Sequence, residues 1–382
     1  MAGIRADHPF SLTRGGPLHH LLSRCRLVDA RGRVRWFRLA AFAWLPLLPA
    51  ALLELAIDGS IDTVILDPTM HVRMLVMLPL LVGAEQLLEV RCERVAHHVR
   101  EEGLVDRTSW AVILDRAEHL RDSRLVEAVL ALVVLALGQA ALWGIAGWGA
   151  YVHGLDVETR FSFVRVWCLA LALPFVQFFL LRWLWRWLVW TYVVVRLSHH
   201  SLSLNAMHPD GAAGLKPLGA PIDAFAVFLA ANFSVASAAW MTEIHERQAT
   251  LQGISSKFFG LVVIAMVVAC GPLLLFLRQL YSARHRDEAA YHLLARRYVD
   301  DFRRKWIVES SGAQALGTPD IQSLNDLGGS YKTTEATRLY PFGMRALVNL
   351  WAGAVAPMLP LVFMTTPISE IGKHVGHIVF GV

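Results

Sequence analysis

The feature that most constrains this chain is a series of about seven apolar stretches, each roughly 20 residues long. A stretch of this length can cross the hydrocarbon core of a bilayer as a helix, because a helix satisfies its own backbone hydrogen bonds. The chain is 55% hydrophobic and 18% charged over 382 residues, which is unusual for a soluble domain. We therefore predict an all-α polytopic membrane protein whose principal partner is the lipid bilayer.

Apolar and charged segments alternate along the chain and define its predicted organisation. We expect transmembrane helices 1 and 2 in 39–90, helices 3 and 4 in 125–195, helices 5 and 6 in 222–277, and helix 7 in 344–366. Between and around the spans we expect a basic N-terminal segment at 1–38, a helical segment at 91–124 and a loop at 196–221. A small helical cap follows at 278–343, and a tail at 367–382.

Arg and Lys residues predict the orientation of the chain. They concentrate in 1–38, 91–124 and 278–343, whereas the loops on the other side of the spans carry few. Because basic loops stay in the cytosol, we expect a cytosolic N-terminus, a cytosolic helical cap and an outer-face tail at 367–382.

The cap segment 278–343 predicts two helices. The first would continue the sixth span, because apolar residues recur at helical spacing at Tyr291, Leu294, Tyr298 and Phe302. The second is expected to begin at Thr318-Pro319-Asp320 and to end at Gly328-Gly329.

Two acids in the second span are candidates for an ion or solute pathway. Glu85 and Glu89 lie four residues apart and therefore on one face of a helix. An acid at the centre of a membrane helix costs about 2.5–3.5 kcal/mol, so it must be paired, protonated or functional. Glu85 is the deeper of the two, and pairing with a nearby arginine is the structural alternative. We predict no metal and no cofactor.

Polar residues in the fifth and seventh spans complete the candidate pathway. Asn232 and Ser234 lie in a fifth span that is rich in alanine and serine, and Asn349 lies in the seventh. The small side chains have two interpretations: they let helices pack closely, or they line a water-filled cavity.

The end of the fourth span combines tryptophan with arginine. Arg182, Trp183, Arg186, Trp187 and Trp190 are typical of a membrane interface, where arginines extend toward lipid phosphates. The alternative is a binding site for a headgroup or another anion.

A polar cytosolic loop contains His208 and Asp210. Proline, aspartate and glycine in this loop predict a tight turn, and the alternative is a site for a proton or cation.

The sequence contains no compact catalytic or nucleic-acid-binding motif, so we predict no catalytic residue and no nucleic-acid partner. Three functions remain: a channel or transporter for a small ion or solute, a non-enzymatic sensor or scaffold whose cap binds a soluble partner, and a membrane-embedded lipid-modifying enzyme. The channel or transporter is the preferred function. In each case the chain could also assemble as a homo-oligomer.

Several stretches resemble a family of uncharacterised bacterial multi-pass membrane proteins with an HPDGxxGL cytosolic loop. These stretches are Pro79–Glu85, Arg121–Leu125, Leu181–Trp190, His208–Leu215, Thr318–Leu327 and Pro341–Gly343. The resemblance implies a shared fold and a bacterial inner-membrane location, but it implies no activity.

Overall fold

The computed structural model describes residues 10–13, 34–59, 63–142, 162–247, 251–308 and 319–365. These residues are mostly helical, and no strand occurs among them, as the predicted all-α class requires. The helices before residue 143 are α2 (Trp36–Trp44), α3 (Leu47–Asp58), α4 (Pro68–Val72), α5 (Leu78–Glu101), α6 (Arg107–Arg121) and α7 (Arg124–Leu142). Those after residue 161 are α8 (Phe163–Trp167), α9 (Leu173–Ser198), α10 (Ile222–Arg247), α11 (Leu251–Cys270), α12 (Leu277–Arg303), α13 (Asp320–Glu335), α14 (Met344–Val355) and α15 (Leu359–Thr365).

Short 3₁₀ or π-helical segments join several of these helices. They are η1 (Thr63–Leu66), η2 (Arg73–Met77), η4 (Cys168–Ala172), η5 (Lys216–Gly219), η6 (Gly271–Phe276), η7 (Arg304–Val308) and η8 (Ala356–Met358). Helix α12 continues α11 through η6, so the helical stretch Gln252–Val308 extends the sixth predicted span well beyond a bilayer thickness.

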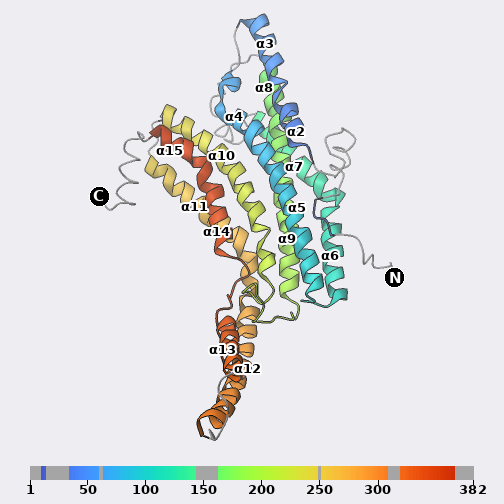
Figure 1. The fold of residues 1–382 in the computed structure, drawn as a ribbon. Helices are drawn as coiled ribbons and strands as arrows, with labels where there is room; N and C mark the ends of the chain where they lie inside the picture. The colour runs from blue at the N-terminus through green and yellow to red at the C-terminus, as the bar shows by residue number, and fades with distance from the viewer. Residues whose placement is uncertain are drawn as a thin grey trace, which may run out of the picture.

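Helix α5 lies at the centre of the bundle, in contact with α2, α9 and α10 (Figure 1). Leu81, Leu88 and Val95 follow one another at seven-residue spacing on α5 and are almost completely buried. Helices α6 and α7 pack against α9, and α14 packs against α10. Because other helices contact α5 on several sides, it can carry charged residues that a lipid-facing helix would not tolerate.

Five helical stretches are long and apolar enough to cross a membrane. They are Trp36–Ile57, Phe163–Ser198, Lys216–His245, Gln252–Val308 and Met344–Met364. They coincide with the first, fourth, fifth, sixth and seventh expected spans, so the chain has the helices of an integral membrane protein. The second and third expected spans, in α5 and α7, are not among the five. Seven spans and a cytosolic N-terminus therefore stay predictions.

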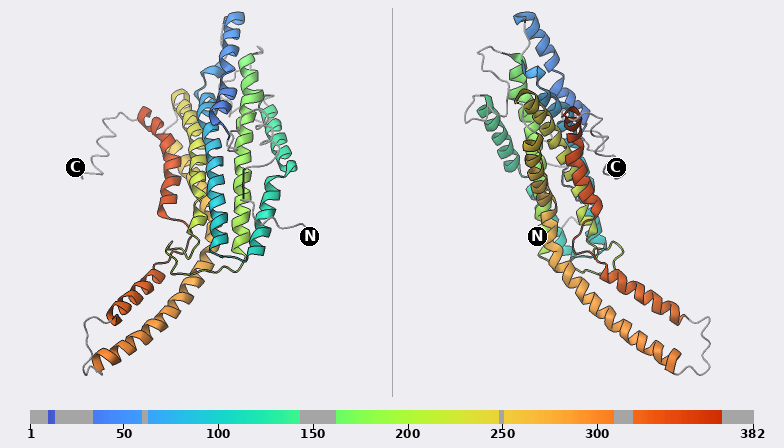
Figure 2. Two further views of the ribbon diagram at one scale, coloured as in Figure 1. Left: turned by 45° about the vertical axis from the view of Figure 1, so that its right-hand side comes forward. Right: turned by 90° about the vertical axis from the view of Figure 1, so that its left-hand side faces the viewer.

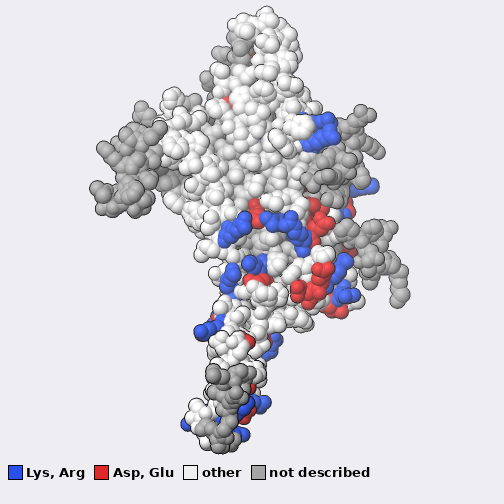
Figure 3. Space-filling view, viewed as in Figure 1, with Lys and Arg blue, Asp and Glu red and all other residues white. Residues whose placement is uncertain are grey.

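Charged residues gather at one end of the bundle, which we call the charged end, while the opposite end shows few charged residues on the face in Figure 3. From the charged end, α12 and α13 project side by side as a two-helix arm (Figure 2). The arm comprises Leu277–Val308 and Asp320–Glu335. The segment expected to form a small cap at 278–343 thus extends away from the bundle for most of its length.

Helix α13 continues through Gly328 and Gly329 to Glu335, so the prediction that this glycine pair ends the helix was wrong. Neither glycine adopts the left-handed conformation that commonly closes a helix. Packing against α12 stabilises α13 on both sides of the pair. The Tyr298 hydroxyl donates to the Asp320 carbonyl at 3.1 Å, and the His292 and Tyr331 rings lie 6.5 Å apart.

Helices α10 and α14 cross with their backbones in direct contact. A Cβ atom at Gly353 would lie 2.2 Å from the carbonyl oxygen of Ala226. Ala224 and Ala231 of α10 are also fully buried. At this crossing the small side chains of the fifth span serve close helix packing, one of their two predicted uses.

Candidate functional site

The strongest sequence candidate, Glu85, forms a buried ion pair with Arg182. The Glu85 Oε1 atom lies 3.1 Å from Arg182 Nη2, and the two side chains are 9% and 3% exposed. The pair joins α5 to α9 inside the bundle. Such a pair is costly to desolvate, and it is much costlier to leave either partner alone.

Arg186 lies one helical turn beyond Arg182 and is 1% exposed. Its Nη1 donates to the backbone carbonyl of Arg121 at 3.4 Å, which connects α9 to the end of α6. We call Glu85, Arg182 and Arg186 the buried charge cluster. It places two cations and one anion inside the bundle.

The second acid, Glu89, binds the backbone of the N-terminal segment 10–13. Its Oε2 accepts the backbone N–H groups of Leu12 and Thr13 at 2.7 and 2.8 Å. The guanidinium of Arg121 donates to the Ser11 carbonyl and to the Asp122 carboxylate. Together these contacts fix the short N-terminal segment 10–13 on the bundle. Glu89 therefore belongs to an anchoring contact, although it lies one turn from Glu85.

The buried charge cluster has more donors than acceptors. Arg182 Nε and Nη1, Arg186 Nε and the indole nitrogens of Trp183, Trp185 and Trp187 are buried without a hydrogen-bond partner. Most buried polar groups in proteins are satisfied, and a bound water or ion commonly supplies the missing partner. Six donors within six consecutive residues mark this part of α9 as a site that would accept such a partner.

The Trp and Arg residues predicted at the membrane interface lie inside the bundle. Trp183 stacks on Phe228 of α10, with ring centroids 3.9 Å apart, and Trp190 is also buried. Trp183 and Trp187 are parallel, with ring centroids 5.9 Å apart. Because the arginines turn inward to Glu85 and Arg121, this set does not form the outward-facing belt that the sequence suggested.

The other pathway candidates do not join the buried charge cluster. Asn232 donates to the Phe228 carbonyl and Ser234 to the Ala231 carbonyl, both at 2.8 Å within their own helix. Such bonds satisfy a polar side chain without a water-filled cavity.

Asn349 belongs to a separate polar contact that links three helices. Its Nδ2 donates to Asp223 Oδ1 at 2.9 Å, and Asp223 Oδ2 pairs with Arg91 Nη2 at 2.7 Å. This contact connects α14, α10 and α5. The sequence analysis missed Arg91 and Asp223, although an acid at the start of an apolar span was a usable signal.

The loop between α9 and α10, residues 199–221, is organised around Asp210, and we call it the junction loop. The carboxylate of Asp210 accepts the backbone N–H groups of Ala212, Gly214 and Lys216 at 2.8, 3.1 and 3.0 Å. His208 Nδ1 lies 3.0 Å from the same carboxylate. The loop also needs positive φ angles, 68° at Gly211 and 90° at Gly214. His208 and Asp210 are thus brought together as predicted, but in a turn that Asp210 holds.

Burial of Asp210 opposes its ionisation, but the backbone hydrogen bonds and the contact with His208 outweigh it and hold the pKa of Asp210 below its usual range. The charged carboxylate therefore stabilises the folded loop above the pKa of an unfolded aspartate. This contribution is lost as the pH falls through the lowered folded-state value.

The junction loop also connects the bundle to the arm. Ala206 donates its N–H to Asp287 at 2.8 Å and accepts the Thr337 hydroxyl at 2.7 Å. Arg338 donates its backbone N–H to the Gly211 carbonyl at 3.0 Å. Hydrogen bonds therefore hold the base of the arm, both from α12 and from the residues directly after α13.

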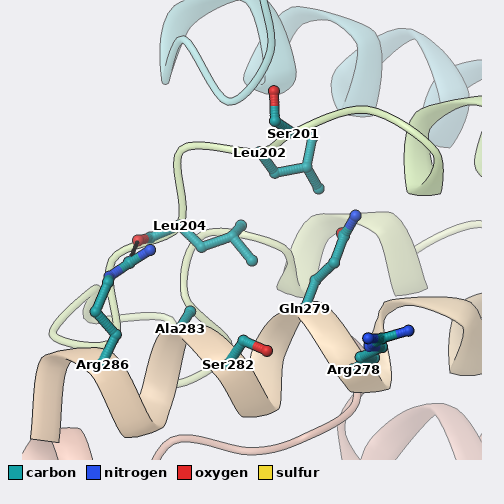
Figure 4. Close-up of a pocket in the computed structure, with 8 residues that line it drawn as sticks. All are labelled: Ser201, Leu202, Leu204, Arg278, Gln279, Ser282, Ala283 and Arg286. Carbon is teal, nitrogen blue, oxygen red and sulfur yellow. Dashed lines mark hydrogen bonds between the residues drawn. The ribbon is translucent and has the colours of Figure 1, made fainter.

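Two pockets lie at opposite ends of the described part of the protein, and Glu85 lines neither of them. A pocket of about 270 Å³, the junction pocket, lies between Ser201–Leu204 and the first turns of α12 (Figure 4). A more apolar pocket of about 380 Å³ lies at the other end of the bundle, between Pro68, Met241 and Leu361.

No protein-family model, curated protein or solved structure shows a significant match to this chain. The resemblance to a bacterial family with an HPDGxxGL loop stays a prediction. Functional proposals therefore rest on the geometry of the chain itself.

Proposed function

We propose that this protein is an integral membrane scaffold whose arm binds a soluble helical partner. The observation that carries the proposal is that the arm has no core of its own. Beyond Ala283, no described residue of α12 or η7 is buried, and the only buried residue of α13 is Thr334.

The arm exposes apolar side chains that a free helical hairpin would bury. Leu293 and Leu294 are each 51% exposed, and Ile307 and Val308 are 67% and 70% exposed near its tip. Two helices without a buried core are marginal in water, because tertiary packing supplies most helix stability. A third or fourth helix laid along the arm would complete a bundle core.

The arm is also placed to hold a partner at a defined distance from the bundle. Helix α12 has 27 residues, which gives a length of about 40 Å. Its base is fixed to the junction loop by the contacts of Asp287, Thr337 and Arg338. A protein bound along the arm would therefore be positioned relative to the membrane helices.

Replacing Leu293 and Leu294 with serine tests the scaffold. We expect a soluble protein to co-purify with the tagged wild-type chain from native membranes, and to bind again when purified and added to the chain in nanodiscs. The serine variant should lose most of this binding, while its stability falls by no more than about 1 kcal/mol, because both side chains are half exposed and serine is a slightly poorer helix former than leucine.

The matched control replaces Arg296 and Arg297, exposed residues of the same helix, with alanine. This variant should bind the partner almost as the wild type does. Wild-type chain that binds no soluble protein, or a serine variant that binds it equally, would contradict the scaffold. Loss of a dimer without any other protein would indicate that the partner is a second copy of the chain.

A channel or transporter for a small ion or solute is the second candidate. The buried charge cluster favours it, because unpartnered donors around Arg182 and Arg186 would accept an anion or a chain of waters. The polar residues of other spans offer it less support, since Asn232 and Ser234 bond to their own helix. Ion flux from proteoliposomes, wild type beside Glu85→Gln, tests it: flux that vanishes in a folded variant supports a conduit.

A lipid-modifying enzyme gains little from the same geometry. The carboxylate of Asp210 is occupied by three backbone N–H groups, which explains the residue without catalysis. We therefore rank this function below the other two.

A further inference from the structure

We propose that the junction pocket binds the phosphate group of an anionic phospholipid, with Arg278 as its principal ligand. The pocket has a volume of about 270 Å³ and lies where α12 leaves the apolar part of the chain. It lies at the base of the arm, whereas Leu293 and Leu294, which carry the proposed scaffold function, lie further along α12.

Arg278 is the free cation of the pocket. It is exposed, and it has no hydrogen-bonding or ionic partner among the described residues. Arg286 lies two turns along the same helix, but its Nε pairs with Asp287 at 3.0 Å and its Nη2 donates to the Leu204 carbonyl at 2.8 Å. The positive charge that remains for a ligand is therefore that of Arg278.

The arrangement of the pocket suits a phosphate group. Arg278, Ser282 and Arg286 follow each other at four-residue spacing, so they form one stripe on α12. Figure 4 shows Ser282 one helical turn from Arg278 on this stripe, with both residues lining the pocket. A guanidinium with a neighbouring hydroxyl is a common donor set for phosphate oxygens.

The opposite wall of the pocket is held in place by Gln279. Its Nε2 donates to the Ser198 and His200 carbonyls at 2.8 and 3.1 Å, at the end of α9. These bonds fix the segment that carries Leu202 and Leu204, whose side chains point into the pocket (Figure 4). The cavity is therefore set by hydrogen bonds that a ligand would leave intact.

The surroundings favour a lipid over a soluble phosphate. Leu274, Leu275 and Leu277, in the turn directly before Arg278, are 45–48% exposed. Acyl chains can cover these side chains while the phosphate of the same molecule reaches Arg278. Basic residues at the border of an apolar span are where anionic headgroups bind.

For the test, the purified full chain is reconstituted into vesicles of phosphatidylcholine mixed with phosphatidylglycerol. It is then extracted in detergent, and the lipids that stay bound to it are compared. Native mass spectrometry should show phosphatidylglycerol retained in preference to phosphatidylcholine. Arg278→Ala should lower this retention roughly five- to tenfold, as expected for the loss of one arginine–phosphate contact. Arg296→Ala, an exposed arginine of the same helix, should retain phosphatidylglycerol like the wild type.

Inorganic phosphate separates the two sources of the ligand. If phosphate at equal concentration displaces phosphatidylglycerol from the wild type, the pocket is a soluble-phosphate site and the lipid assignment is overturned. Equal retention by wild type and Arg278→Ala would overturn the site itself. Because Arg278 has no partner among the described residues, its replacement should leave the unfolding midpoint unchanged. An unchanged midpoint in Arg278→Ala would confirm that a loss of lipid reports on binding.

Discussion

Replacing Arg182 with methionine is expected to lower the free energy of unfolding by about 3–5 kcal/mol. The variant removes the cation 3.1 Å from Glu85, whose side chain is 9% exposed, and leaves Arg186 as the remaining cation of the buried charge cluster. The loss should lie near the lower end of this range, because two unpartnered N–H groups are removed together with the charge. Unfolding of the purified protein in micelles, followed by tryptophan fluorescence, measures the change.

Two further variants show whether the ion pair is responsible. Arg196→Met alters an exposed arginine of the same helix and should change the stability by less than about 0.5 kcal/mol. Glu85→Leu combined with Arg182→Met removes both charges and should recover most of the lost stability, since apolar replacements of a buried pair are often neutral or stabilising. A single Arg182→Met variant as stable as the wild type would show that Glu85 has another partner or is neutral.

Gly353→Ala is expected to destabilise the protein by about 1–3 kcal/mol, although alanine is the better helix former. The new Cβ would lie 2.2 Å from the Ala226 carbonyl oxygen and 2.9 Å from the carbonyl carbon. Both atoms belong to the backbone, so α14 must move away from α10. The shift should also weaken the contact between Asn349 and Asp223, which bridges the same two helices at 2.9 Å. The unfolding midpoint in micelles measures this effect.

Gly260→Ala is the matched control for this crossing. Gly260 lies in α11, is exposed, and has nothing within 4 Å of an added Cβ. This variant should be neutral or up to about 1 kcal/mol more stable, because alanine favours the helix. If Gly353→Ala lowers the stability and Gly260→Ala does not, then backbone contact, and not helix propensity, decides the outcome at Gly353. Equal signs for the two substitutions would mean that the two helices separate at little cost.

The sequence predicted the helical class and five of the spans because these depend on local properties. A run of apolar residues such as Phe258–Leu277 needs a helix in any apolar surrounding, whichever helix lies beside it. The long helix that carries Tyr298 and Phe302 was also predictable, since its apolar spacing is visible in the chain. The turn at Asp210 and Gly211 followed from residue type in the same way.

The tertiary structure decided which polar groups meet. Glu85 could have faced a pathway, a metal or a neighbour, and only the side-by-side position of α5 and α9 pairs it with Arg182. Contact with α10 likewise buries Trp183 and Trp187, although tryptophan and arginine near a span end usually indicate a surface. The chain alone therefore determined that these helices form and which faces are apolar. Their neighbours, and with them the partner of each charge, depend on contacts between residues about 100 positions apart, which no local pattern records.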